Sequence, residues 1–122
     1  MTEWIELKIK NNLRYNGGKI LQYSSKQIAM DIANILKNKK AVDVVVLDIS
    51  HLTVVTDYFI IASGRSEIQV KALYNEVEEK MQEKGLVPKH KDGYQAGRWI
   101  VLDYGDAIVH IFHHEERGFY SL

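Results

Sequence analysis

Three histidines and two glutamates stand close together near the end of the chain, and these side chain types are ligands for zinc and related metals. They are His110, His113, His114, Glu115 and Glu116. The segment around His110 has the composition of a β-strand, in which residues three positions apart point to opposite faces. His110 and His113 are therefore not expected to share a face. We interpret the group as one half-buried histidine followed by two solvated ones, and we expect no metal and no cofactor.

Four aspartates could form a two-metal site for phosphoryl transfer, because carboxylates hold the cations of such enzymes. They are Asp43, Asp48, Asp103 and Asp106. The segment Ser63-Gly64-Arg65-Ser66, which precedes a predicted helix, would add a helix N-terminus that binds anions. Nucleotidyltransferases, however, follow a Gly-Ser pair with two carboxylates in a D-x-D or D-x-E unit on one strand, and this chain contains no D-x-D. A nucleotidyltransferase-like enzyme is therefore the alternative hypothesis, and a binding protein without catalysis is preferred.

Basic residues on the predicted helices could contact RNA phosphates. They are Arg65 with Lys71, and Lys26 with Lys37, Lys39 and Lys40. The chain as a whole holds sixteen basic and sixteen acidic residues and so has a formal net charge of zero. This balance argues against a free-standing nucleic-acid binder, which carries an excess of positive charge. Any contact with RNA would have to be local.

The elements that position these side chains begin with a predicted β-hairpin, the most apolar part of the chain. Two β-rich runs, 100–102 and 107–112, flank a short segment with turn-forming Gly and Asp residues. If Tyr104-Gly105 is the loop, Asp103 faces Asp106 and Trp99 faces His110. Alternation then makes one face entirely apolar, and we expect it in the core: Ile100, Leu102, Ala107, Val109 and Ile111.

The other face of the hairpin carries Trp99, Val101, Ile108 and His110, and it ends in aspartates at the turn. A tryptophan and a histidine among aliphatic residues could lie under a helix. They could equally await a partner protein, because tryptophan and tyrosine are enriched at the centres of interfaces.

The remaining elements follow from hydrophobic periodicity and capping patterns. Ser24-x-x-Gln27 and Ser66-x-x-Gln69 predict the starts of two helices, the second ending before Gly85. The aliphatic run 42–49 suits a central strand covered on both sides. Further strands are expected over 57–64 and, at a sheet edge, over 86–91. The fold class is thus α/β, a single domain with a mixed β-sheet flanked by helices.

Length and composition fit one domain, expected over residues 24–122, in a cytoplasmic protein. No apolar run approaches the length of a membrane span, no secretory pattern opens the chain, and there is no cysteine. Residues 1–23 form an N-terminal extension. Alternation from Ile5 to Ile9 predicts a strand, and the turn signal Asn16-Gly17-Gly18 could fold residues 19–23 back to pair with it as a hairpin. The alternatives are that the extension is a mobile arm, or that translation truly starts at Leu21.

Four segments together resemble the Iojap family of ribosomal silencing factors, called RsfS in bacteria. They are Asp43-Val-Val-Val-Leu-Asp48, Thr56-Asp-Tyr-Phe-Ile-Ile-Ala-Ser-Gly64, Trp99-Ile-Val-Leu-Asp-Tyr-Gly-Asp-Ala-Ile-Val-His-Ile-Phe112 and Arg117-Gly-Phe-Tyr-Ser-Leu122. The third segment is the most specific. The resemblance implies a homodimeric α/β protein with a nucleotidyltransferase-like topology and no established catalysis. It also implies binding to the large ribosomal subunit through ribosomal protein L-fourteen, which blocks subunit joining when nutrients are scarce.

The resemblance further suggests which residues contact the ribosomal partner. Most of them come from the segment between Trp99 and His110, and two match the second motif. The expected partner-binding residues are Trp99, Asp103, Tyr104, Asp106, His110, Asp57 and Tyr58.

Overall fold

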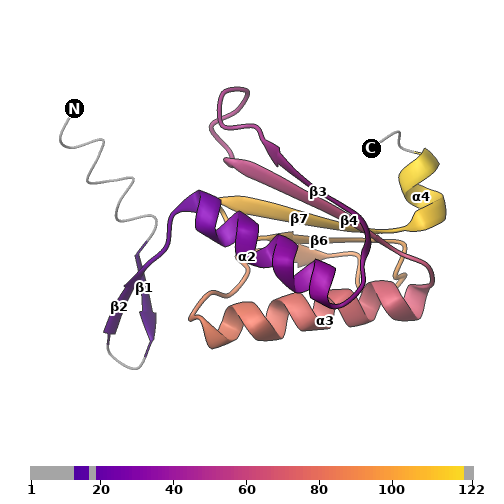
Figure 1. The fold of residues 1–122 in the computed structure, drawn as a ribbon, viewed down its shortest axis with the longest axis horizontal. Helices are drawn as coiled ribbons and strands as arrows, with labels where there is room; N and C mark the ends of the chain where they lie inside the picture. Colours follow the sequence, from indigo (N-terminus) through magenta and orange to yellow (C-terminus); the bar gives the residue numbers. More distant parts are fainter. Residues whose placement is uncertain (1–12, 17–18, 120–122) are drawn as a thin grey trace.

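The computed structural model describes residues 13–16 and 19–119, and its centre is a five-stranded sheet in the order β3-β4-β7-β6-β5. Two helices, α2 (Ser25–Asn38) and α3 (Glu67–Glu83), lie side by side against one face of this sheet (Figure 1). The strands are β3 (Val42–Asp48), β4 (Tyr58–Gly64), β5 (His90–Asp92), β6 (Trp99–Asp103) and β7 (Ala107–His113).

Strand β4 runs parallel to β7, whereas the other neighbouring pairs are antiparallel. Two parallel strands need a long crossover connection. Here the chain between β4 and β7 provides it, and it contains α3, β5 and β6. The mixed sheet with helices packed on it confirms the fold class expected from the sequence.

Both helices start where the sequence predicts. The hydroxyl of Ser24 accepts a hydrogen bond from the backbone N–H of Gln27, and Ser66 does the same for Gln69, each at 3.1 Å. These bonds satisfy N–H groups that have no partner within the helix. Gly85, at a φ of 81°, directly follows the C-cap residue of α3, as the sequence predicts.

The core lies between the two helices and the sheet. Its strand residues include the five hairpin positions expected there, all with no exposed surface: Ile100, Leu102, Ala107, Val109 and Ile111. The helices contribute aliphatic residues at helical spacing, among them Ile32, Leu36, Leu73 and Val77. Burial of this apolar area is the main force that holds the layers together.

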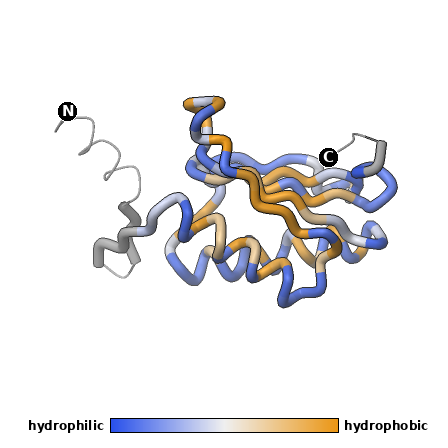
Figure 2. The backbone as a smooth tube through the Cα atoms, turned by 45° about the horizontal axis from the view of Figure 1, so that its top comes forward, coloured by the Kyte–Doolittle hydropathy of each residue, from blue (hydrophilic) through white to orange (hydrophobic). Residues whose placement is uncertain are grey.

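The prediction that β3 is a central strand covered on both sides is wrong, because β3 is an edge strand with only one face packed on the core. Val44 and Val46 pack against the core, whereas Val45 and Leu47 are 37% and 41% exposed. Figure 2 shows this apolar strand leading into the loop that projects at the end of the sheet. An unbroken aliphatic run therefore does not reveal whether its second face is covered.

The hairpin is present, but its turn lies one residue later than expected. The N–H of Tyr104 donates to the carbonyl of Ala107 at 2.9 Å, so the turn residues are Gly105 and Asp106. Asp103 consequently pairs with Ile108, and Trp99 pairs with Phe112 instead of His110. The pairing moves by two residues along β7. Each strand residue therefore keeps the face that alternation assigned to it.

Three further details differ from the sequence-based expectation. The edge strand β5 is shorter and lies later than the expected 86–91. The segment after β7 is a helix, α4 (His114–Phe119), where a tail without regular structure was expected. Strands β1 (Leu13–Asn16) and β2 (Lys19–Gln22) pair as a hairpin, while the first strand expected at Ile5 to Ile9 lies outside the described residues. Within the described part of the chain, none of the helices has the length and apolar character needed to cross a bilayer.

Candidate docking surface

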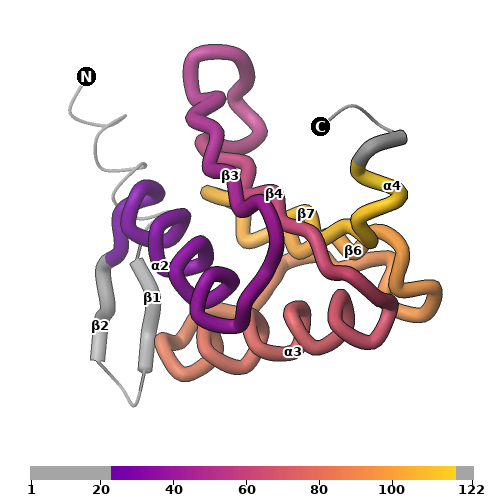
Figure 3. Tube along the Cα trace, turned by 45° about the vertical axis from the view of Figure 1, so that its right-hand side comes forward, coloured from indigo at the N-terminus to yellow at the C-terminus, as the bar shows by residue number. Residues whose placement is uncertain are grey.

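Among the elements that the structure describes, α4 alone lies against the face of the sheet opposite α2 and α3, and it does so at one end (Figure 3). Alternation along the paired strands places one set of side chains on this face, which we call the open face. Most of these side chains are apolar and several are partly exposed. The residues of the open face are Val45, Leu47, Phe59, Ile61, Trp99, Val101, Asp103, Ile108, His110 and Phe112.

An aromatic cluster lies on the open face near the start of β6. The ring of Trp99 stacks on Phe112 with centroids 5.0 Å apart, and Phe59 meets His110 edge to face at 4.9 Å. The indole N–H of Trp99 donates to Nδ1 of His110 at 3.1 Å. Trp99 remains 39% exposed, whereas Phe112 is fully buried. The indole is thus fixed by its neighbours and still presents an apolar surface to solvent.

His110 is a neutral imidazole in this arrangement. Its Nδ1 accepts a hydrogen bond and so carries no proton, which leaves the proton on Nε2. Burial lowers the pKa of His110, because the charged form loses solvation within the aromatic cluster. Protonation of Nδ1 of His110 would place an N–H opposite the indole N–H of Trp99, and the hydrogen bond between the two side chains would be lost.

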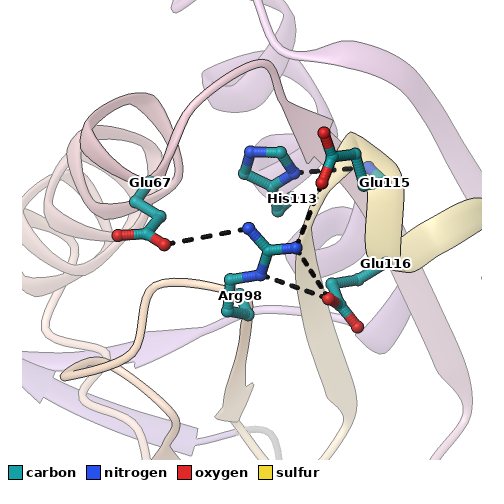
Figure 4. A network of polar contacts seen from close by, with 5 residues as sticks. All are labelled: Glu67, Arg98, His113, Glu115 and Glu116. Atoms are coloured by element: carbon teal, nitrogen blue, oxygen red, sulfur yellow. Dashed lines mark hydrogen bonds and ion pairs between the residues drawn. The ribbon is translucent and has the colours of Figure 1, made fainter.

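Trp99 is positioned by the charged residue that precedes it. Figure 4 shows Arg98 between the start of α3 and the start of α4. Its guanidinium donates to Glu116 at 2.8 Å and to Glu115 at 3.3 Å, and it lies 3.8 Å from Glu67. The bond with Glu116 is the main reason that the pKa of Arg98 is raised. This network ties the start of β6 to both helices and so fixes the strand at Trp99.

The expected acidic residues gather at the opposite end of the hairpin. Asp103 accepts a bond from the N–H of Gly105 at 2.7 Å, and the carbonyl of Asp106 accepts from the N–H groups of Asp57 and Tyr58. The carboxylate of Asp57 in turn accepts from the hydroxyl of Ser25 at 2.6 Å. Asp57 therefore anchors the start of α2 to the sheet, which is a structural role.

Two of the expected partner-binding residues point into the protein. Tyr104 is 2% exposed, on the same side of β6 as Leu102, and burial raises the pKa of its hydroxyl. Tyr58 packs against the core and is only partly exposed. Tyr104 was placed in the turn by the sequence-based register, whereas the observed turn residues are Gly105 and Asp106, and Tyr104 directly follows the last residue of β6. We therefore leave both tyrosines out of the docking surface.

The residues considered for phosphoryl transfer do not form one site. Asp43 and Asp48 stand at opposite ends of β3, and Asp48 is paired with Tyr58 across the sheet. The hydroxyl of Ser63 is buried and accepts a hydrogen bond from Arg117 of α4 at 3.0 Å. In the part of the chain that the structure describes, no three metal-ligating side chains converge.

Sequence reasoning missed much of the apolar surface. The partly exposed residues of β3 and β4 were assigned to a covered strand or left unassigned, and no sequence signal separates an open from a covered strand face. The loop after β3 adds further exposed apolar side chains at the same end of the sheet as Leu47: Leu52, Val54 and Val55.

Comparisons with known proteins identify relatives over most of the chain. Residues 22–122 match the family model described as "Ribosomal silencing factor during starvation". The chain is 37% identical over 99 residues to a ribosomal silencing factor of Halalkalibacterium halodurans, which covers 81% of this chain and 85% of that protein. A second relative, from Bacillus subtilis, is 36% identical and is covered to 84% of its length. A crystal structure of a protein from Chromobacterium violaceum superposes with a TM-score of 0.78 at 33% identity, covering 81% of this chain and 82% of that one.

Proposed function

This chain belongs to the RsfS family of ribosomal silencing factors, and from that membership we propose how it silences. It binds the large ribosomal subunit through ribosomal protein L-fourteen and blocks joining of the small subunit, which represses translation when nutrients are limiting. The proposal places the protein in the cytoplasm, where subunits join. Silencing of this kind is steric and needs no catalytic group.

The observation that carries the proposal is the composition of the open face. Trp99 offers a fixed, partly exposed aromatic side chain, and apolar residues of the other strands lie on the same face of the sheet. Rigid aromatic residues are frequent at the energetic centre of interfaces, because little conformational entropy is lost when they are buried. This apolar centre has the character expected of a surface that binds another protein.

The acidic residues at the turn end of the open face support a basic partner. Asp103 lies on the face itself, and Asp48 and Asp106 lie at the adjoining strand ends. Ribosomal proteins must neutralise RNA, so a basic partner surface suits a carboxylate rim. An acidic rim raises the rate of encounter with such a partner more than it raises the affinity, and the apolar centre supplies most of the affinity.

We also propose that the free protein is a homodimer, as the resemblance to the family implies. Two broad surfaces could serve, the outer surfaces of α2 and α3 and the open face. An isologous dimer buries the same patch of both subunits, so it would use one of these surfaces in each copy. If the open face is used, dimerisation and binding to the ribosome exclude each other.

The docking surface is tested by replacing Trp99. We expect Trp99→Ala to weaken co-sedimentation with purified large subunits by at least about 30-fold, the effect typical of an interface residue worth 2 kcal/mol or more. The matched control is Tyr94→Ala. Tyr94 is an aromatic residue of nearly equal exposure, 41%, that packs on Tyr74 of α3, away from the open face.

The two variants separate the docking surface from general effects of losing an aromatic ring. We expect the Tyr94 variant to bind as the parent protein does. Equal affinity of the Trp99 variant and the parent, with both folded by circular dichroism, would remove the open face from the proposal.

A further inference from the structure

We propose that a cluster of four basic residues holds backbone phosphates of ribosomal RNA while the open face holds the ribosomal protein. This inference rests on the proposed function, and it adds a second, chemically different contact. The four residues lie where α2 ends and α3 begins, and we call them the basic corner: Lys37, Lys39, Lys40 and Arg65.

One side chain joins the two halves of the corner. The amide oxygen of Gln69 accepts a bond from the backbone N–H of Arg65 at 2.6 Å, and its amide nitrogen donates to the carbonyl of Lys40 at 3.2 Å. Gln69 thereby bridges the turn after α2 and the turn after β4. The backbones of Lys40 and Arg65, which are distant in the sequence, are thereby held close to each other.

The charges of the basic corner have no ion-pair partner among residues 13–16 and 19–119. All four side chains are exposed, and none forms an ion pair in the described part of the chain. Other cations of the same domain are paired, for example Arg98, Lys84 and Lys91. Glu67, an acid beside the corner, is engaged by Arg98. The corner thus carries four exposed basic side chains on a chain of zero net charge, with the exposed Asp43 as a neighbouring acid, and this excess of positive charge suits a polyanion.

Lys40 occupies a backbone position that glycine would fill at lower cost. Its φ is 66°, and the N–H of the next residue, Ala41, bonds to the carbonyl of Leu36 at 2.9 Å. This is the usual arrangement at a helix C-terminus, where a left-handed residue is most often glycine. A side chain there costs about 1 kcal/mol. The helix dipole favours a positive charge near the end of α2. It does not explain why a lysine, and not a glycine, occupies the left-handed backbone conformation of residue 40.

The basic corner adjoins the end of the open face that holds Trp99. Ser63 of β4 pairs with Phe112 of β7, which pairs with Trp99 of β6, and Arg65 follows Ser63 by two residues. A partner surface that covers Trp99 can therefore extend to the corner. Ile68, 83% exposed in the first turn of α3, adds an apolar contact for a ribose or a base. A ribosomal protein embedded in RNA offers this combination of an apolar contact flanked by phosphates.

The test neutralises the corner and compares the salt dependence of binding. The variant carries Lys37→Gln, Lys39→Gln, Lys40→Gln and Arg65→Gln. The matched control carries Lys26→Gln, Lys80→Gln, Lys84→Gln and Lys89→Gln, which removes the same charge from the far ends of the helices and the loop before β5. The affinity of each protein for purified large subunits is measured between about 50 and 200 mM KCl, the range over which phosphate contacts dominate salt dependence.

Loss of four phosphate contacts lowers the slope of log affinity against log salt by about 3, because each contact contributes 0.7 to 0.9. We expect this change in the corner variant and not in the control. A corner variant with the parent's slope would overturn the inference, whatever its affinity.

A second measurement keeps the inference separate from the proposed function. The same proteins are titrated with 23S ribosomal RNA stripped of protein at low salt. We expect the corner variant to bind this RNA at least about tenfold more weakly than the control. If the parent fails to bind large subunits, the proposed function falls while the RNA titration still decides the inference. If the corner variant loses affinity for subunits but not for RNA, the corner contacts an acidic protein and the inference is wrong.

Discussion

His110 and Trp99 depend on each other. The indole donates to a nitrogen that accepts only while the imidazole is neutral, and burial favours that neutral form. The folded protein therefore resists protonation of His110, whose pKa in the unfolded chain is near 6.5. Because the unfolded chain takes up the proton first, acid shifts the equilibrium toward unfolding.

The pH dependence of stability checks this coupling. The contribution of His110 is complete above pH 6.5 and is lost as the pH falls below that value, since its folded pKa lies lower. We expect the free energy of unfolding to fall less between pH 7.5 and 5.5 in His110→Asn, whose amide oxygen can still accept from Trp99. The control is His90→Asn, at an exposed position of β5. Urea titrations that give the same pH profile for the parent and the His110 variant would contradict the coupling.

At the residue scale, the sequence predicted which face of the hairpin carries Trp99, but not how Trp99 is held there. The alternation of the hairpin placed Trp99 and His110 on a face separate from the core, and the structure agrees. The sequence could not show that Trp99 and His110 are diagonal neighbours on β6 and β7, because this register depends on which residues form the turn. The same turn decides that Tyr104 is buried, and neither Tyr104 nor Gly105 has a residue type that fixes the register alone.

Trp99 also depends on the loop between β5 and β6. Gly93 has a φ of 87°, and a Cβ there would lie 2.0 Å from the carbonyl oxygen of Trp99. Backbone cannot move aside as a flexible side chain can. The close approach of this loop, together with the ion pairs of Arg98, sets where β6 begins.

Two alanine substitutions separate the close contact from the backbone conformation. Gly105 has nearly the same φ, 86°, but its Cβ would meet the end of the Lys89 side chain, which can move. We expect Gly93→Ala to lower the free energy of unfolding by about 3 kcal/mol, from strain and overpacking. Gly105→Ala should cost about 1 kcal/mol, from conformation alone. Equal losses in denaturant titrations would contradict the role given to the contact with Trp99.

At the element scale, the sequence predicted features that depend on neighbouring residues, such as helix caps, but not features that depend on how the strands are ordered in the sheet. The starts of α2 and α3 follow from Ser-x-x-Gln patterns, because a cap is completed within four residues. The place of β3 at the edge of the sheet depends on which strands follow it, and its aliphatic run carries no record of that order. The short helix α4 was missed because residues 114–119 lack an apolar repeat.

On the scale of the whole molecule, zero net charge conceals a separation of charge. The basic corner lies at one end of the sheet, and the aspartates around the hairpin turn lie at the other. The open face connects the two ends. Composition alone argued against a nucleic-acid binder, but it could not show that basic residues from α2 and the start of α3 meet. A ribosomal surface made of protein and RNA matches this arrangement better than either component alone.

The central claim is that the protein, once bound to the large subunit, prevents the small subunit from joining. The most direct measurement is light scattering as purified subunits associate, with the large subunits saturated beforehand by the parent protein or by Trp99→Ala at the same concentration. We predict that the parent protein suppresses formation of the complete ribosome and that the Trp99 variant does not. Undiminished association while the parent protein remains bound to the large subunit would contradict the account.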